Sequence, residues 1–299
     1  MRILVTGCNG QVGWEVARSC QPLGEVLAAD RSIVDLARPD ALAAAVRHLR
    51  PDVIVNTAAY TAVDAAEDDE ASARRVNAEA VGVLADEASH IGALLVHYST
   101  DYVFDGTKEG PYVESDTPDP LGAYGRTKLA GENALAASRA DWLCLRTSWV
   151  YAARGKNFLR TILRLAAERE ELRIVADQVG APTSARLVAD VTAHVVARAA
   201  EWRRRGTFAP AVLHATAGGA TSWHQFAARI VELARAAPRA PALKVQRVVP
   251  IGAAEYPTKA RRPANSRMDC SELERRFGVR MPGWERGVEL TVAEVLAGG

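Results

Sequence analysis

The chain has 299 residues, of which 48% are hydrophobic and 24% are charged. This composition is ordinary for a globular protein that buries a sizeable core. The formal net charge is +1, which excludes a strongly basic nucleic-acid-binding surface and gives no sign of a membrane-surface protein. An anionic ligand must therefore be bound by local groups.

The first half of the sequence alternates short apolar runs with helical patterns. Continuous apolar runs are typical of strands buried on both faces, and they occur at Ile3–Val5, Val26–Ala29, Val53–Val55, Leu94–His97 and Leu143–Leu145. Helical spacing lies between them, at Gln11–Cys20, Asp40–Leu49, Ala73–Ser89 and Tyr124–Ala137. This alternation predicts an α/β fold with a doubly wound parallel sheet of the Rossmann type, whose ligands bind at the carboxyl ends of the strands.

The second half is less regular. We expect a helix at Asn157–Glu170, a strand at Leu172–Val175, and a loop at Asp177–Ser184 that leads into a helix through Ala200. A surface connection at Trp202–Pro210 and a helix at Trp223–Ala236 follow. These segments predict a smaller C-terminal α/β lobe.

Three glycines follow the first predicted strand and open the first helix. Gly7, Gly10 and Gly13 have GxxGxxG spacing. Glycines allow a tight turn, and the helix N-terminus offers unpaired N–H groups to a pyrophosphate. Glycine spacing alone is a weak signal, but this context favours dinucleotide binding. We therefore expect residues 1–150 to form a dinucleotide-binding domain, to which segments near 185–215 return, and residues 151–299 to form mainly a substrate-binding lobe.

Residues at the ends of the next strands are candidates for further cofactor contacts. Asp30 ends the second strand, where a carboxylate can bind the adenosine ribose and favour NADH. Arg31 could instead pair with a 2′-phosphate and favour NADPH, or the two residues could form a solvated turn. Asp35 and Leu36 could flank the adenine, or simply form the turn before the next helix. The choice between NADH and NADPH stays open.

The candidate catalytic residues are Thr100, Tyr124 and Lys128. Tyr124 and Lys128 lie four residues apart on a predicted helix, so they share one face. A nearby ammonium stabilises a phenolate and lowers the phenol pKa from about 10 toward the working range. Thr100 follows the fourth strand, where its hydroxyl could hydrogen-bond Tyr124 and a substrate carbonyl, or act only as a cap.

The four cysteines are irregularly spaced and the six histidines show no metal-ligand pattern, so we expect no metal site and reduced thiols. The sequence MRILVTG leaves no room for a signal peptide, and no run approaches the length of a membrane helix. We expect a cytoplasmic protein without a membrane or nucleic-acid partner.

Together, these motifs resemble the extended short-chain dehydrogenase/reductase superfamily, and within it the dTDP-4-dehydrorhamnose reductase family. Matching runs include GCNGQVGWE from Gly7, HYSTDYVFDG from His97, YGRTKLAGE from Tyr124 and DQVGAPTSARLVAD from Asp177. The resemblance implies NADPH or NADH as cofactor and a dTDP-sugar as substrate. It implies reduction of the C4 ketone of dTDP-4-dehydro-6-deoxy-L-mannose to dTDP-L-rhamnose, a donor for bacterial surface polysaccharide.

The resemblance also implies residue roles. Tyr124 gives its proton to the C4 oxygen, Lys128 holds the nicotinamide ribose and lowers the Tyr124 pKa, and Thr100 tunes the pair. The implied cofactor contacts are Gly10, Gln11, Val12, Asp30, Asp35, Leu36, Ala59, Tyr60, Thr61 and Tyr98. The implied sugar-nucleotide contacts are Thr100, Asp101, Tyr124 and Trp149, although core packing is the preferred interpretation of Trp149 without the resemblance.

One departure from the family concerns assembly. Arg186 stands where some members carry an acidic residue used at a metal-bridged dimer contact, while Glu294 remains acidic. We therefore expect no magnesium-bridged dimer, and a monomer or a homodimer both stay open. Two alternatives to the function also stay open: a reductase or epimerase acting on another sugar nucleotide, and a non-catalytic, dinucleotide-binding regulatory subunit such as that of methionine adenosyltransferase.

Overall fold

A six-stranded parallel sheet forms the centre of the larger part of the computed structural model, which describes residues 1–238 and 242–298. Its order is β10-β5-β4-β3-β1-β2, and every neighbouring pair is parallel. The bounds are Arg2–Thr6 for β1, Glu25–Ala29 for β2, Val53–Asn56 for β3, Leu94–Thr100 for β4, Asp141–Thr147 for β5 and Ala211–His214 for β10. The predicted doubly wound sheet is confirmed.

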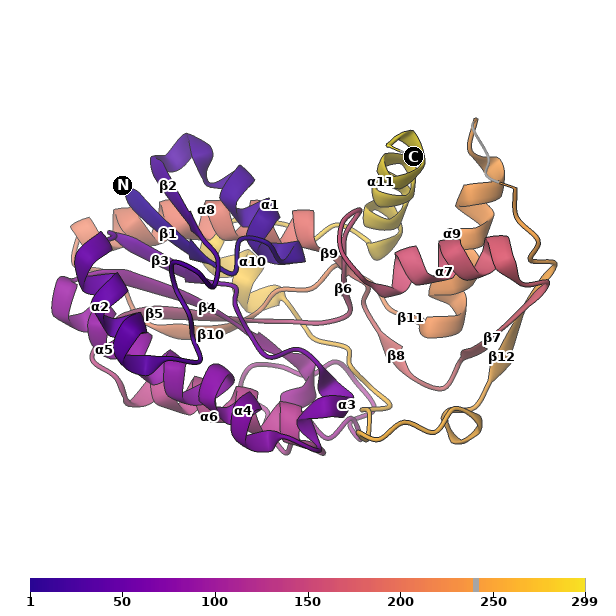
Figure 1. Ribbon diagram of the computed structural model, residues 1–299, viewed down its shortest axis with the longest axis horizontal. Coiled ribbons are helices and arrows are strands. Elements are labelled where there is room, and N and C mark those ends of the chain that lie inside the picture. The colour runs from indigo at the N-terminus through magenta and orange to yellow at the C-terminus, as the bar shows by residue number, and fades with distance from the viewer. Residues whose placement is uncertain (239–241, 299) are drawn as a thin grey trace.

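Helices cover both faces of this sheet, because successive strand residues point to opposite sides. Ile3 and Val5 pack with α1 and α8, whereas Leu4 packs with α2 and α5. In Figure 1, α1 and α8 lie above the sheet and α2, α5 and α6 lie below it. The helix bounds are Gln11–Ser19 for α1, Pro39–Leu49 for α2, Glu70–Arg74 for α4, Ala80–Ile91 for α5, Ala123–Ala137 for α6, Ala185–Arg204 for α8 and Ser271–Phe277 for α10.

Two elements of this part differ from the expectation. Helix α8 continues to Arg204, where a surface connection was expected from Trp202, and the chain turns only at Gly206, whose φ is +68°. The predicted elements did not include β10, which pairs with β5. Residues 185–214 thus contribute both α8 and β10 to the region of the large sheet.

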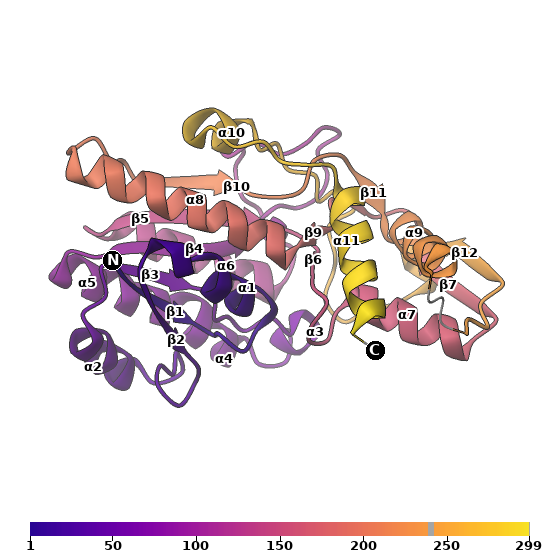
Figure 2. The same ribbon diagram turned by 90° about the horizontal axis from the view of Figure 1, so that it is seen from above.

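A smaller α/β region lies beyond the carboxyl ends of the strands (Figures 1 and 2). Its core contains Tyr151, Phe226 and Trp284. It is built from α7 (Phe158–Glu168), α9 (Trp223–Ala236), α11 (Trp284–Ala297) and the parallel pair β7 (Glu171–Val175) and β12 (Arg247–Ile251). The expected loop at 177–184 contains β8 (Val179–Gly180), which pairs with β11 (Thr221–Ser222), and β9 (Thr183–Ser184), which pairs with β6 (Val150–Tyr151).

The strand order places the ligand-binding edge. From β1 the chain adds β2 on one side and then crosses over to add β3, β4 and β5 on the other side, so the strand order reverses between β1 and β3. In open α/β sheets ligands bind in the crevice at this point. The loops after β1, β3, β4 and β5 open there, toward the smaller region (Figure 1). Within the part of the chain that is described, no helix is long and apolar enough to cross a membrane.

Candidate active site

The glycine turn after β1 is packed so tightly that side chains are excluded. Gly7 has a φ of +64°, and a Cβ added to it would lie 2.9 Å from the Cα of Ala58. A Cβ on Gly13 would lie 2.2 Å from the Gly7 carbonyl oxygen and 2.6 Å from Oγ1 of Thr57. Helix α1 therefore begins directly beside the strand ends, and its first turn has no side-chain cap. This cradle fits a diphosphate at a helix N-terminus.

Asp30 lies next to this turn, just after β2. Its carboxylate accepts hydrogen bonds from the backbone and hydroxyl of Ser32 at 2.9 and 2.6 Å, and a longer one from Asn9 at 3.4 Å. The Ser32 bonds hold the pKa of Asp30 below its usual value. Arg31 is exposed beside it. A negative and a positive side chain thus stand together at this end of the crevice.

The other expected cofactor residues fall into two groups. The accessible group contains Gln11, Val12, Asp35, Ala59 and Tyr60, which are partly exposed, and Thr61, which is exposed. The Leu36 side chain is instead buried in the core.

The loop after β3 is fixed by Asn77, whose side chain bonds the Tyr60 N–H at 2.9 Å and the Tyr60 carbonyl at 3.1 Å. Asn77 was not among the expected site residues.

The structure brings the three candidate catalytic residues to one edge of the sheet. Thr100 ends β4, and Tyr124 and Lys128 lie in the first two turns of α6. Thr100 and Lys128 are buried, while Tyr124 is partly exposed. The Lys128 ammonium donates to the Tyr98 carbonyl oxygen at 2.5 Å and lies 3.2 Å from Nε2 of His97.

The pKa of Tyr124 differs from the expectation. Burial raises it well above its usual value, the Asp101 carboxylate raises it further, and the Thr100 hydroxyl lowers it. Burial also lowers the pKa of Lys128 to about 8. The predicted lowering of the phenol pKa by Lys128 is therefore wrong for this structure, in which burial raises that pKa and Lys128 is not among the groups that shift it. At neutral pH the phenol is protonated, and it can donate a proton.

Unpaired polar atoms gather beside the catalytic residues. Asp101 is 2% exposed, and burial raises its pKa to about 6, although the nearby Ser266 hydroxyl and the hydrogen bond from Thr100 lower it. Among the described residues no group bonds its Oδ2, and the hydroxyls of Ser99 and Thr147 are likewise buried without a partner. Buried polar atoms are nearly always satisfied, so this cluster at the ends of β4 and β5 fits a ligand that completes it.

Trp149 marks the junction between the large sheet and the smaller region. Its φ of +47° lies in the left-handed region that non-glycine residues rarely adopt. The ring stacks on Trp223, with centroids 3.6 Å apart and 11° between the planes. A Cβ on Gly180 would lie 2.7 Å from this ring. Trp223 and Gly180, which sequence reasoning missed, hold the indole, and the strained backbone of Trp149 is of the kind found at ligand sites.

Tyr98 is placed differently from the other expected cofactor residues. Its side chain is directed into the core, where the phenol hydroxyl lies 2.6 Å from the Thr192 hydroxyl of α8. Only its backbone carbonyl reaches Lys128. The structure thus connects Tyr98 to the site through its backbone.

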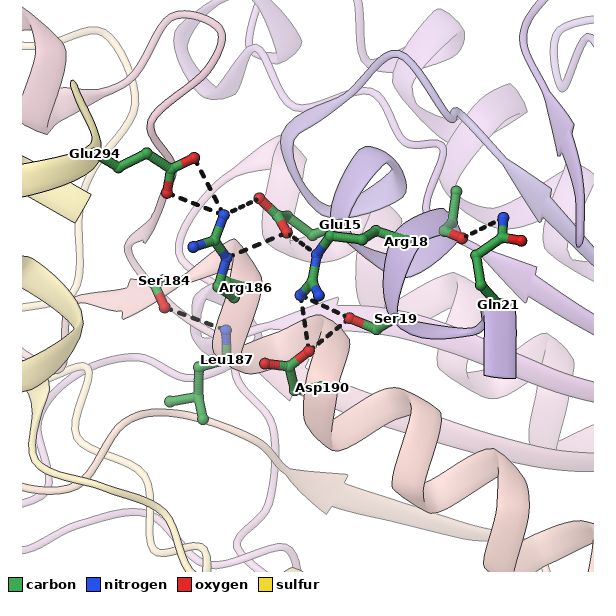
Figure 3. Close-up of polar contacts among 10 residues, drawn as sticks. Glu15, Arg18, Ser19, Gln21, Ser184, Arg186, Leu187, Asp190 and Glu294 are labelled. Atoms are coloured by element: carbon green, nitrogen blue, oxygen red, sulfur yellow. Dashed lines mark hydrogen bonds and ion pairs between the residues drawn. The ribbon is translucent and has the colours of Figure 1, made fainter. Parts of the chain in front are cut away.

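Arg186 occupies the centre of an ion-pair network (Figure 3). Its guanidinium lies 3.4 Å from Glu15 of α1 and 2.9 Å from Glu294 of α11. Glu15 also pairs with Arg18 at 2.9 Å. Among the described residues no group of three or more His, Cys, Asp or Glu side chains could hold a metal ion. The positive charge between the Glu15 and Glu294 carboxylates is the Arg186 guanidinium.

Comparison with known proteins identifies the family. Residues 1–297 match the family model described as the RmlD substrate binding domain. The dTDP-4-dehydrorhamnose reductase of Burkholderia thailandensis is 57% identical over 297 residues, which cover 99% of this chain and 100% of that protein. The chain belongs to the dTDP-4-dehydrorhamnose reductase family.

Solved structures of this family have the same fold. The reductase of Clostridium acetobutylicum has a TM-score of 0.88 at 34% identity, covering 99% of both chains. The reductase of Bacillus anthracis, solved in complex with NADP, has a TM-score of 0.87 at 33% identity and covers 98% of this chain and 99% of its own. The expected family is thus confirmed.

Proposed function

We propose that this family member reduces the C4 ketone of dTDP-4-dehydro-6-deoxy-L-mannose to dTDP-L-rhamnose with NADPH or NADH. The observation that carries the proposal is that Thr100, Tyr124 and Lys128 lie at the same carboxyl edge of the sheet as the glycine cradle. The 57% identical relative bears the name of this reductase, and a family structure is a complex with NADP.

The chain offers a complete set of groups for the dinucleotide. The turn of Gly7, Gly10 and Gly13 and the start of α1 take the diphosphate. Asp30 and Arg31 face the adenosine ribose, so both cofactors are included in the proposal. Lys128 holds the nicotinamide ribose. When bound, the reduced nicotinamide supplies the hydride. We assign cofactor binding to residues 1–150 together with the returning segment 185–214, and substrate binding mainly to the remainder of 151–299.

The proton comes from Tyr124. Its raised pKa keeps the phenol protonated at neutral pH, so it can donate to the C4 oxygen as charge develops there. The Thr100 hydroxyl favours the phenolate that remains. The free oxygen of Asp101 accepts a hydrogen bond from a sugar hydroxyl, and the indole of Trp149 offers a flat apolar surface to the sugar nucleotide.

A stoichiometric assay tests this function. The purified protein is mixed with the ketone and either NADPH or NADH, and cofactor absorbance is compared with the amount of dTDP-L-rhamnose formed. We expect one cofactor oxidised for each ketone reduced. Sugar-nucleotide conversion without net consumption indicates an epimerase, and cofactor binding without turnover of any sugar nucleotide indicates a regulatory subunit. Either result would contradict the proposal.

A further inference from the structure

A row of buried polar side chains runs under the sheet to Lys128. Strand register places Thr6 opposite Asn56 and Asn56 opposite His97. The Thr6 hydroxyl donates to Oδ1 of Asn56 at 2.6 Å, and Nδ2 of Asn56 lies 3.0 Å from Nδ1 of His97. Nε2 of His97 lies 3.2 Å from Nζ of Lys128. All four residues are at most 2% exposed. No step of the reaction described above uses His97.

This row limits where the lysine can point. An ammonium has three N–H donors and no acceptor. One donor of Lys128 is directed at the Tyr98 carbonyl and a second at His97, both from β4. One N–H therefore remains for a group in the crevice. Without His97, two donors would be free and the long lysine side chain would have more positions to choose from.

The charge on Lys128 also decides the tautomer of His97. A charged lysine needs an unprotonated Nε2 as acceptor, so the proton of the neutral imidazole must lie on Nδ1. It then bonds the Asn56 oxygen, with the amide nitrogen and oxygen exchanged relative to the orientation in the structure. A neutral lysine can instead accept from Nε2–H, and the Asn56 NH₂ then donates to Nδ1. The two arrangements differ by an exchange of the amide nitrogen and oxygen, which have nearly the same shape.

We propose, on the basis of the proposed function, that His97 is a positioning residue that holds the Lys128 ammonium in the direction required for cofactor binding and for catalysis by Tyr124. It stays neutral and accepts a hydrogen bond at Nε2. Asn56 and Thr6 hold the ring in place from the opposite side.

The charges around Lys128 agree with this role. The groups that affect its pKa are Glu132, one turn further along α6, and Cys144 on β5, while burial lowers the pKa to about 8. Glu132 is itself paired with Arg146 at 2.6 Å. Burial and the nearby ammonium hold the pKa of His97 well below its usual value. Lys128 is thus the group of this pair that titrates near neutral pH, and His97 remains uncharged.

Nitrogen NMR of the imidazole rings tests the arrangement without any assay of activity. The His97 signals are identified by their loss in His97→Gln. At pH 7 we expect a proton on Nδ1 of His97 and none on Nε2. When the pH is raised and Lys128 loses its charge, the proton should move to Nε2, and Lys128→Met should abolish this change. A proton on Nε2 at pH 7 would overturn the proposal.

Kinetics of His97→Leu test the positioning role. Loss of the acceptor disfavours the charged lysine, so the pKa of Lys128 falls. When the pH is raised, activity is therefore lost at a lower pH than in the wild type. We expect kcat to fall about tenfold and the basic limb of the pH profile to move down by about half a pH unit or more. His97→Gln, whose amide oxygen can accept, should restore the wild-type limb.

A matched control separates this effect from general loss of structure. His214 of β10 is equally buried, and its ring lies 3.1 Å from the Asp269 carbonyl oxygen and 3.5 Å from the Arg146 guanidinium rather than against Lys128. His214→Leu should leave the basic limb in place. If the basic limb of the His97→Leu profile lies at the same pH as in the wild type, the positioning role is refuted. Absence of turnover in the wild type would refute the proposed function instead, and the NMR result would remain interpretable.

Discussion

Asp101 is a carboxyl group held in the interior with one oxygen unbonded by any described group. Burial raises its pKa to about 6, above the value of about 3.9 for an unfolded chain. The folded protein therefore binds more protons than the unfolded chain between these two values. The free energy of unfolding therefore falls as the pH rises through this window. Above the window, the full cost of holding the charged carboxylate in the interior is present.

Replacing Asp101 by Asn removes this cost. We expect Asp101→Asn to raise the free energy of unfolding at pH 8 by about 2 to 3 kcal/mol and to give little gain at pH 4, while kcat falls because a sugar contact is lost. Denaturant unfolding at the two pH values measures the difference. Asp105→Asn is the control, because hydrogen bonds from Thr107 and Tyr112 lower the pKa of Asp105 and its loss should destabilise at pH 8. An equal gain at both pH values contradicts the account.

Residue types at the site were predictable from the sequence, but their surroundings were not. The helical period and the strand end place Tyr124, Lys128 and Thr100 at one edge from local sequence alone. The pKa of Tyr124 depends on burial by distant segments. Likewise, a strand that is apolar on both faces does not reveal that Tyr98 turns toward α8 and His97 toward α6.

Helix α1 depends on the absence of a side chain at one position. A methyl group on Gly13 would collide with the backbone of Gly7 and the side chain of Thr57, so α1 must move away from the strand ends. Gly13→Ala should fold and yet bind NADPH at least about tenfold more weakly, since the helix N-terminus no longer meets the diphosphate. Fluorescence titration measures the affinity.

The control for this variant is Gly82→Ala on α5. A Cβ there would have its nearest contact at 3.8 Å, and alanine favours a helix over glycine. We expect unchanged affinity and slightly higher stability. Unchanged NADPH affinity in Gly13→Ala would contradict the proposed position of the cofactor.

Strands differ in how well the sequence predicts them. The five continuous apolar runs all form strands, β1 to β5. Burial on both faces explains the pattern of β1, β3, β4 and β5, whereas the edge strand β2 is only partly buried. Strand β12 was not among the predicted elements. It contains Pro250, which an edge position tolerates, and among the described residues it pairs only with β7. Strand β10 has four residues and is recognisable only from its pairing with β5.

At the scale of the whole molecule, few polar contacts join the two regions near α1. Asn157 of the smaller region donates to Gln11 at 2.9 Å, and the Arg154 guanidinium lies 3.5 Å from the ring centroid of Trp14. Arg186 adds the links to Glu15 and Glu294 (Figure 3). These contacts connect the helix that carries the glycine cradle to the region proposed to bind the sugar.

Arg186→Gln tests how strongly this network holds α11. Arg186 and Glu294 are more than 40% exposed and Glu15 keeps Arg18, so we expect a loss of stability of about 1 kcal/mol or less that fades at high salt. Amide hydrogen exchange in residues 284–297 should become faster. Arg164→Gln, which breaks a pair within α7, is the control. Unchanged exchange in α11 shows that apolar packing alone holds this helix.

The most direct test of the central claim is the rate of cofactor oxidation by Tyr124→Phe with the dTDP-linked ketone. Tyr102→Phe removes the neighbouring phenol, whose ring centroid lies 5.5 Å from that of Tyr124. We predict that Tyr124→Phe binds NADPH normally but loses roughly two to four orders of magnitude in kcat, whereas Tyr102→Phe keeps most of the activity. A wild-type rate in Tyr124→Phe would contradict its assignment as the proton donor.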